Sequence, residues 1–427
     1  MSGRLLIRGG RLLDPRAGID GPGDLLVVDG RVAAADGGPV EREIDATGRV
    51  VCPGFFDLRA RLHLPGADAM GLARELRAAV AGGVTSVLLP PDTQPRVEEP
   101  AVAYFLAEHA ARLGLARVLP VALLVRDGAA PALAPLGALQ AAGCVAAATL
   151  DAAVDVLVLR RALEYAASHE LPVLLPAQDP VLAGEGCLHE GATAVHLGLT
   201  GIPQAAEQLG IERALILARL TGARVHLCGV SSAAGAARIG AAVREGLAVS
   251  GDVAIANLCF DDGAAADYDS DFHLQPPLRS REDRLALVAA VRDGVLGLCS
   301  DHRPVDADHK QVPFARSLPG AATFETLLPA GLERVTAGEL DLPALVAALS
   351  AVPAWLTARL PGAGGGLAPG ARADLCIFDP DLEWSAPDAH WHSAGRNTPW
   401  RGRRLRGRVT HTLVAGRLVH ELAGAAP

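Results

Sequence analysis

The stretch ARVHLCGVSSAAGAARIGAAVREGLAVSGDVA, residues 223–254, contains the unit that decides the fold. It begins and ends with an apolar run, at 223–231 and 247–254, and the segment between them carries small and apolar residues at helical spacing. Runs of this apolar kind are typical of strands buried on both faces of a parallel sheet. Because parallel strands need a crossover connection, usually a helix, the stretch predicts a strand–helix–strand unit.

The same alternation extends over the middle of the chain. Further apolar runs, which predict strands, lie at 84–90, 117–124, 171–176 and 295–301. Helical patterns occupy 71–83, 102–114, 158–170, 211–222 and 281–294, and several of them stop at glycine. Strands and helices alternating over about 300 residues predict an α/β fold, a (β/α)8 TIM-like barrel.

Both ends of the chain have a different, strand-rich character. DGR at 29–31 and AGR at 415–417 are typical of hairpin turns, and each lies between two apolar runs. Neither end is long enough to hold a core of its own. We therefore expect one small β-sandwich domain built from residues 1–52 and 366–427, with the barrel at 53–365.

Composition excludes several classes of function. The net charge is −9 and the basic run at 401–408 alternates with small residues, which favours a solvated face or a subunit contact over nucleic-acid binding. No uncharged run reaches the roughly 20 residues that span a bilayer. The first residues do not resemble a secretory signal, and the seven cysteines form no CxxC pair. These features predict a cytoplasmic protein with free thiols and no membrane partner.

Residues 53–66, PGFFDLRARLHLPG, resemble the start of the barrel in the dihydroorotase branch of the amidohydrolases. Segments similar to that family follow in order to about residue 420, among them AGGVTSVLLPPDTQP, GLTGIPQAAEQLGIERALILARLTGARVHLCGVSSAAG, QPPLRSREDR, SDHRPV and GLAPGARADLCIFDP. The resemblance implies pyrimidine synthesis and the reversible opening of a cyclic amide by zinc-bound hydroxide. That chemistry needs histidines and carboxylates at the C-terminal ends of the barrel strands.

The positions that resemble the zinc ligands have almost all changed. The four histidine positions are occupied by Arg59, Arg61, Pro176 and Gly229. Arginine is always cationic and has no lone pair for a metal, and proline and glycine offer no ligand atom. The acidic ligand falls in 144–149, where there is no carboxylate, although a shifted alignment would bring in Asp151. The sequence therefore predicts that zinc is lost and that no cofactor is bound.

One ligand position is kept, at Asp301, which the resemblance also makes the general base. Alternate residues of a strand share a face, so Arg59 and Arg61 are both expected to point into the pocket. A buried carboxylate without its metal needs another cation, so we expect Arg59 or Arg61 to pair with Asp301. Arginines turned outward are the alternative.

The positions that resemble the substrate contacts have also changed, to His63, Asp92 and Gln275. Asp92 would repel an anionic substrate where the asparagine of the family donates a hydrogen bond. His226, a lone histidine in an apolar strand, is more typical of a hydrogen-bonded core residue than of a ligand.

These changes predict a chain that is not an enzyme, a pseudoenzyme. The resemblance implies a non-catalytic subunit that binds aspartate carbamoyltransferase and forms a homo-oligomer. One alternative is a cyclic-amide hydrolase with an atypical or absent metal centre, built from Asp301, His302, His226 and His63. Another is a ligand sensor in which Arg59 and Arg61 grip an anion.

Overall fold

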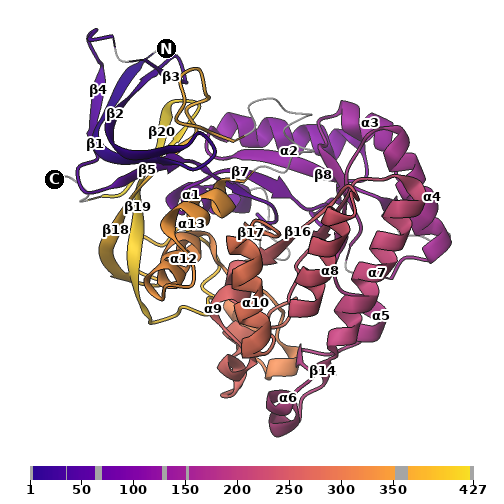
Figure 1. Ribbon diagram of the computed structural model, residues 1–427. Coiled ribbons are helices and arrows are strands. Elements are labelled where there is room, and N and C mark those ends of the chain that lie inside the picture. Colours follow the sequence, from indigo (N-terminus) through magenta and orange to yellow (C-terminus); the bar gives the residue numbers. More distant parts are fainter. Residues whose placement is uncertain are drawn as a thin grey trace.

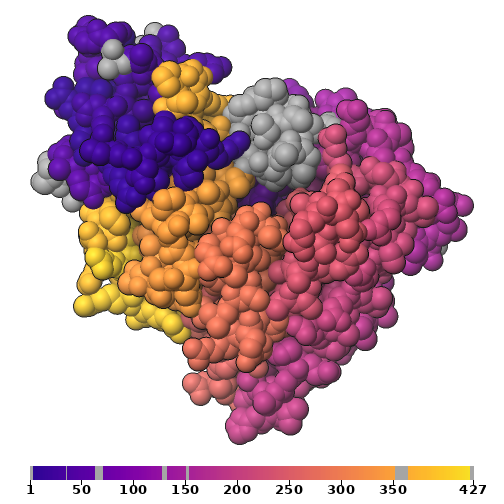
Figure 2. All heavy atoms as spheres, in the orientation of Figure 1, coloured from indigo at the N-terminus to yellow at the C-terminus, as the bar shows by residue number. Residues whose placement is uncertain are grey.

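The fold was analysed in a computed structural model, which describes residues 3–34, 36–62, 70–126, 132–150, 153–351 and 364–423. Two large sheets organise the chain, one built from its middle and one from its two ends. In Figure 1 the N- and C-termini lie on the same side of the molecule, beside the second sheet. Figure 2 shows the indigo and yellow ends of the chain packed together next to the magenta and orange middle.

The middle of the chain forms an eight-stranded sheet in which every neighbouring pair is parallel. Its strands follow one another in chain order: β6 (Phe55–Asp57), β7 (Val84–Leu89), β8 (Arg117–Leu123), β11 (Ala146–Ala148), β12 (Val173–Pro176), β15 (Val225–Cys228), β16 (Val249–Ala254) and β17 (Gly297–Cys299). Just beyond the first and last strands, Ala60 pairs with His302, and the amide of Arg61 donates to the carbonyl of His302 at 2.8 Å. This contact closes the sheet and brings the chain after β6 beside the chain after β17.

Helices cover the outside of this sheet (Figure 1). The longer ones are α1 (Met70–Ala81), α2 (Pro100–Leu113), α4 (Val156–Ser168), α7 (Gln204–Thr221), α8 (Ala233–Arg244), α10 (Arg281–Arg292), α12 (Leu327–Thr336) and α13 (Leu342–Ser350). Shorter elements lie between them: α3 (Leu136–Ala141), α5 (Pro180–Ala183), α6 (Ala192–Leu197), α9 (Ile255–Cys259), α11 (Ala307–Lys310), η1 (Asp262–Ala265), η2 (Ser270–Phe272), η3 (Phe314–Arg316), η4 (Phe324–Thr326), β9 (Val125–Arg126), β10 (Ala132–Leu133), β13 (Leu188–His189) and β14 (Gly201–Ile202).

The strand–helix–strand unit predicted at 223–254 is confirmed as β15, α8 and β16. Ser232 begins α8, and its hydroxyl accepts the amide of Gly235 at 3.0 Å, as an N-cap serine does. β11 was not predicted from the sequence, because its three alanines carry neither the β-branched nor the aromatic signal of a strand.

The two ends of the chain meet in the second sheet. Its strands are β1 (Arg4–Asp14), β2 (Ile19–Val28), β3 (Arg31–Ala33), β4 (Arg42–Asp45), β5 (Val50–Pro53), β18 (Leu375–Ser385), β19 (Arg404–Val414) and β20 (Arg417–Glu421). β5 joins the ends, because it pairs parallel with β1 and antiparallel with β18. The sheet has its own apolar cluster, which includes Ile7, Val51 and Leu413. The predicted barrel, with a β-domain formed by both termini, is confirmed; the boundaries at residues 53 and 366 stay a prediction.

The predicted turns and the basic run agree with this sheet. Val28 pairs with Arg31, and Val414 pairs with Arg417, so DGR and AGR close hairpins. Four arginines of the basic run face carboxylates, in the pairs Arg401–Asp271, Arg404–Glu383, Arg406–Asp381 and Arg408–Asp388. A run neutralised in this way offers little charge to a polyanion. In the part of the chain that the structure describes, no helix combines the length and the hydropathy that a membrane span requires.

Candidate active site

The closed barrel places Arg59 against Asp301. Arg59 follows β6 and Asp301 follows β17, and the Arg59 Nε atom lies 3.1 Å from the Asp301 Oδ1 atom. The Nη1 atom of Arg61 lies 4.0 Å from the same oxygen. All three side chains are at least four-fifths buried. The predicted pairing of a strand-1 arginine with Asp301 is confirmed, and the alternative of arginines turned outward is wrong.

Asp301 itself sits in an unusual backbone conformation. Its φ is +49°, in the left-handed region that residues other than glycine rarely adopt. Strain of this kind persists where the surroundings hold a side chain in place, often at a functional site. Burial raises the pKa of Asp301 above its usual range, and Arg59 and Arg61 offset only part of that rise. The carboxyl group is therefore suited to exchange a proton nearer neutral pH than an exposed aspartate.

Arg61 has a second carboxylate partner. Its Nε atom lies 2.5 Å from the Asp92 Oδ2 atom, in the loop that follows β7. Asp92 was predicted to be a changed substrate position, and the structure shows that its charge is matched by Arg61. His63, the neighbouring substrate position, lies outside the described residues, as does Asp151, the alternative acidic ligand.

Gly229 provides the space that the Arg59 guanidinium fills. A Cβ atom at position 229 would lie 2.9 Å from both Arg59 Nη1 and Nη2, closer than real Cβ contacts. The φ of Gly229 is +72°, which also disfavours any other residue there. The position that resembles a histidine ligand is thus occupied by the end of the Arg59 side chain.

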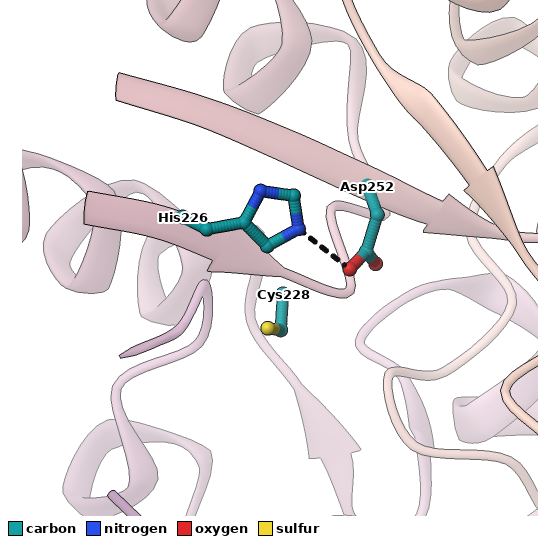
Figure 3. Close-up of side chains that lie close together, drawn as sticks. All are labelled: His226, Cys228 and Asp252. Atoms are coloured by element: carbon teal, nitrogen blue, oxygen red, sulfur yellow. Dashed lines mark hydrogen bonds and ion pairs between the residues drawn. The ribbon is translucent and has the colours of Figure 1, made fainter. Parts of the chain in front are cut away.

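A polar cluster that acts on Arg59 contains His226, Cys228 and Asp252 (Figure 3). Asp252, on β16, accepts a hydrogen bond from the His226 Nε2 atom at 3.0 Å and another from the Gly229 amide at 2.8 Å. Burial opposes the ionisation of Asp252, but Arg59 and His226 outweigh it and lower the pKa to about 2. Asp252 is therefore a second fixed negative charge beside the guanidinium, and sequence reasoning missed it because it lies in an apolar run.

His226, Cys228 and Asp252 form the one close group of three metal-ligating side chains among the described residues. They do not fit a zinc ion. The His226 Nδ1 atom shares a hydrogen bond with the Ser250 hydroxyl at 2.8 Å, so both ring nitrogens are already engaged. An ion there would also sit beside the cationic Arg59, and a three-ligand zinc site needs free lone pairs on each residue. The interpretation of His226 as a hydrogen-bonded core residue is confirmed.

The barrel mouth contains a cavity of about 140 Å³ beside these groups. Its walls are mainly apolar, with Leu58, Leu88, Val121 and Leu174 among them, and its polar lining includes Arg59, Arg61 and Asp92. Pro176 and Cys228 also line it. Gly229 and Gln275 line a smaller adjoining cavity of about 30 Å³, which Arg59 and Pro176 share. The structure thus brings the described ligand-like and substrate-like positions together around these two cavities. Asp301 lies next to them, in contact with Arg59.

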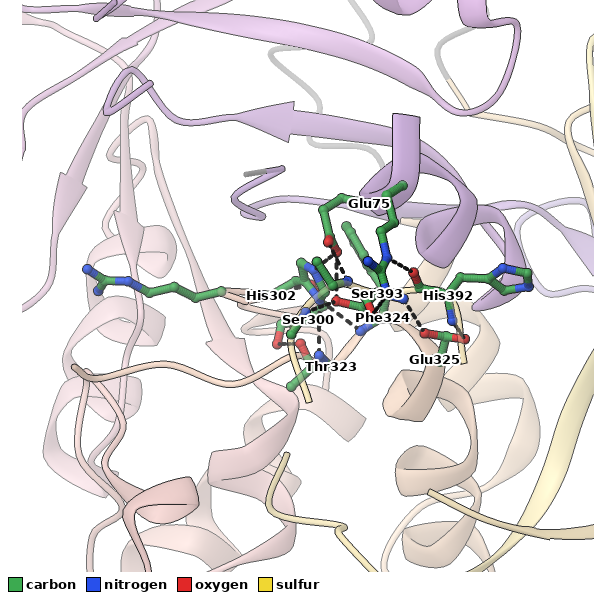
Figure 4. Close-up of polar contacts among 12 residues, drawn as sticks. Glu75, Ser300, His302, Thr323, Phe324, Glu325, His392 and Ser393 are labelled. Carbon is green, nitrogen blue, oxygen red and sulfur yellow. Dashed lines mark hydrogen bonds and ion pairs between the residues drawn. The ribbon is translucent and has the colours of Figure 1, made fainter. Parts of the chain in front are cut away.

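His302 does not belong to this pocket. Its side chain is fully buried, its Nε2 atom lies 2.8 Å from the Glu75 Oε2 atom, and its Nδ1 atom accepts the amides of Thr323 and Phe324. The ring therefore connects α1 with η4 (Figure 4). The alternative of an atypical hydrolase named His302 and His226 as site residues, and the structure places both in buried hydrogen-bonded networks outside the two cavities.

The network behind Asp301 extends to the C-terminal part of the chain (Figure 4). Glu75 also accepts the Ser393 hydroxyl and the Ala394 amide, each at 2.8 Å. Glu325 accepts the amides of His392 and Ser393, and burial raises its pKa to about 8 despite these bonds. At the end of β6, burial likewise raises the pKa of Asp57 to about 7, partly offset by hydrogen bonds from Ser300. This scaffold fixes the chain on either side of Asp301.

Comparison with known proteins shows the family. The sequence profile of a family described as Dihydro-orotase-like matches residues 48–234. A protein of Anaeromyxobacter dehalogenans named dihydroorotase is 43% identical over 431 residues, 99% of each chain. A dihydroorotase-like protein of Pseudomonas aeruginosa is 42% identical and covers 97% of this chain and 99% of its own.

Solved structures show the same fold. An L-hydantoinase (dihydropyrimidinase) from Arthrobacter aurescens superimposes with a TM-score of 0.85 at 24% identity, over 99% of this chain and 96% of its own. A dihydropyrimidinase from Brevibacillus agri does so with a TM-score of 0.81 at 23% identity, over 98% and 95%.

The prediction that this chain is not an enzyme is contradicted, because relatives at 42–43% identity over its whole length carry the name of an enzyme. The prediction counted only the positions that resemble metal ligands. It did not consider what a guanidinium and a carboxylate can do in the same pocket. The chain belongs to the dihydroorotase-like family of amidohydrolases.

Proposed function

We propose that the chain hydrolyses a cyclic amide in the cavity at the mouth of its barrel. The observation that carries the proposal is the retained carboxylate of Asp301, held against the pocket-lining Arg59 at 3.1 Å. The family supports it, since the full-length relatives are named dihydroorotase. So does the location, because active sites of these barrels lie at the C-terminal ends of the strands.

Opening a cyclic amide requires three contributions: a base for water, charge stabilisation for the carbonyl oxygen, and a proton for the departing nitrogen. The raised pKa of Asp301 suits it to take a proton from water and return it to the ring nitrogen. The guanidinium of Arg59 supplies positive charge for the carbonyl oxygen. Its Nη2 atom is buried and has no hydrogen-bond partner within the described part of the chain, so it is available to an oxygen of a ligand.

This arrangement is weaker than a metal-bound hydroxide, because a guanidinium does not lower the pKa of water to near 7 as zinc does. We therefore expect turnover to be slow. No step of the proposal uses a metal ion, since the residues present do not fit one.

The pocket favours an uncharged substrate. Arg59 faces Asp301 and Arg61 faces Asp92, so each arginine of the lining is already matched by a carboxylate. A substrate carboxylate would meet the negative charge of Asp92, whereas a neutral ring would meet apolar walls and paired charges. We propose a neutral cyclic amide or ureide, of the size of dihydrouracil or hydantoin.

The test is a ring-opening assay of the purified chain with dihydroorotate, dihydrouracil and hydantoin, in which loss of the ring is followed by absorbance and by chromatography. We expect turnover of at least one ring, and a kcat/KM for the neutral rings at least about tenfold above that for dihydroorotate. The absence of ring opening with all three would contradict the proposal. A preference for dihydroorotate would contradict the assignment of a neutral substrate only.

We further propose that the chain works in the cytoplasm, in pyrimidine synthesis, and that it associates with aspartate carbamoyltransferase and with copies of itself. Exposed apolar side chains on one side of α7, namely Leu209, Ile216 and Leu220, support an assembly of some kind. Light scattering of the chain, alone and mixed with the carbamoyltransferase, measures both associations.

A further inference from the structure

We infer that the Arg59 guanidinium occupies a built-in cation site at the centre of the barrel mouth, and that removing this side chain turns the site into a receptor for a small cation. The inference concerns what fills the centre of the barrel. It does not depend on turnover, so it stands or fails separately from the proposed hydrolysis.

The charges around Arg59 point to a cation site. Asp301 follows β17 and Asp252 lies on β16, so two neighbouring strands direct carboxylates at the guanidinium. Both carboxylates raise the pKa of Arg59 well above its ordinary value, although burial acts against this. Arg61 lies 4.0 Å from Asp301, and His226 bonds Asp252 at 3.0 Å, but Arg59 is the cation that both carboxylates share. Taking the guanidinium away would therefore leave two buried carboxylates with less matching charge, which is a costly state for a protein interior.

The space around Arg59 points the same way. The guanidinium lies against Gly229, where a Cβ atom would come within 2.9 Å of two of its nitrogens and within 3.0 Å of the Pro276 Cδ atom. A side chain at position 229 would therefore require the guanidinium of Arg59 to move from its place at this centre. Arg59 and Gly229 form a complementary pair, one filling the space that the other leaves open.

Arg59 and Asp301 form an ion pair, but their atoms are not aligned for a hydrogen bond. Its Nε and Nη2 atoms and the Asp301 Oδ1 atom are buried and form no hydrogen bond within the described residues, even though Nε and Oδ1 are 3.1 Å apart. An arginine selected for a carboxylate usually forms two parallel hydrogen bonds. The Asp301 Oδ1 atom could therefore accept a hydrogen bond from a small cation that is not tethered to the chain.

The test begins with Arg59→Ala. We expect the melting temperature to fall by about 5 °C, because a buried charge pair loses one partner. Millimolar guanidinium chloride should restore at least about half of this loss, by binding the folded chain. Urea, which has the same shape without the charge, should restore none, and guanidinium should not raise the melting temperature of the wild-type chain.

Gly229→Ala tests the pair from the other side. In the wild-type chain it should lower the melting temperature by more than Gly222→Ala, the matched control, because Gly222 has a φ of +70° but open space around it. In the Arg59→Ala background the difference in cost between the two glycine substitutions should shrink, since the clash with the guanidinium is gone and only the tight contact with Pro276 remains. If Arg59→Ala proves too unstable to purify, the two glycine substitutions can be compared in an Arg59→Lys background, because lysine has a smaller head group.

Three results would overturn the inference. They are stabilisation of Arg59→Ala by urea as much as by guanidinium, equal stabilisation of the wild-type chain by guanidinium, and equal costs of Gly229→Ala and Gly222→Ala in the wild-type chain.

Discussion

Replacing Asp301 with asparagine is expected to lower the rate of ring opening by a factor of about 10²–10⁴, the contribution typical of a general acid–base group. Asparagine keeps the shape of the side chain but cannot take a proton from water. The wild-type rate should rise with pH as Asp301 loses its proton, and should level off above its raised pKa. The variant should lose this rise. Initial rates between pH 5 and 9 measure both effects.

The matched control for Asp301→Asn is Asp308→Asn, which changes an exposed aspartate on the short helix α11 close by in the chain. It should leave the rate and its pH dependence unchanged. Circular dichroism confirms that both variants are folded. A rate for Asp301→Asn within a factor of about three of the wild-type rate would remove Asp301 from the chemistry.

Replacing Glu75 with alanine is expected to lower the free energy of unfolding by about 3–5 kcal/mol. Glu75 has no exposed surface and accepts hydrogen bonds from His302, Ser393 and Ala394. Its removal leaves two buried donors and one partly buried donor unpaired, and each buried unpaired donor costs about 1–3 kcal/mol. Unfolding in urea, followed by tryptophan fluorescence, measures the loss.

Two further variants calibrate the effect of Glu75→Ala. Arg77→Ala changes an exposed residue of the same helix and should cost less than about 1 kcal/mol. Glu75→Gln keeps one acceptor oxygen, so its loss in the free energy of unfolding should lie between those of Arg77→Ala and Glu75→Ala. A loss below about 1 kcal/mol for Glu75→Ala would mean that the network does not hold the scaffold behind Asp301.

The fold could be predicted because its signals are local. The runs at 223–231 and 247–254 became β15 and β16, and the turns at 29–31 and 415–417 became hairpins, because apolar periodicity and glycine turns act over a few residues. The pairing of Arg59 with Asp301 could also be predicted, since barrel closure makes the first and last strands neighbours.

The rest of the site could not be predicted because it depends on burial across long distances in the chain. A glutamate in a helical pattern, such as Glu75 at 71–83, is usually a solvent-exposed charge. Glu75 is instead buried, and it contacts His302 and Ser393. Asp252 is one aspartate in an apolar run, and nothing local shows that it faces Arg59. The wrong prediction of a chain without enzymatic function had a similar origin, because it weighed single positions and not the pocket that they form together.

The most direct test of this account is the metal content of the wild-type chain. The chain would be incubated with excess zinc, dialysed, and analysed by plasma mass spectrometry together with its Asp301→Asn variant. A centre filled by the Arg59 guanidinium predicts less than about 0.1 zinc per chain in both proteins, since a divalent ion would be repelled there. About one tightly held zinc per wild-type chain, lost in Asp301→Asn, would contradict it.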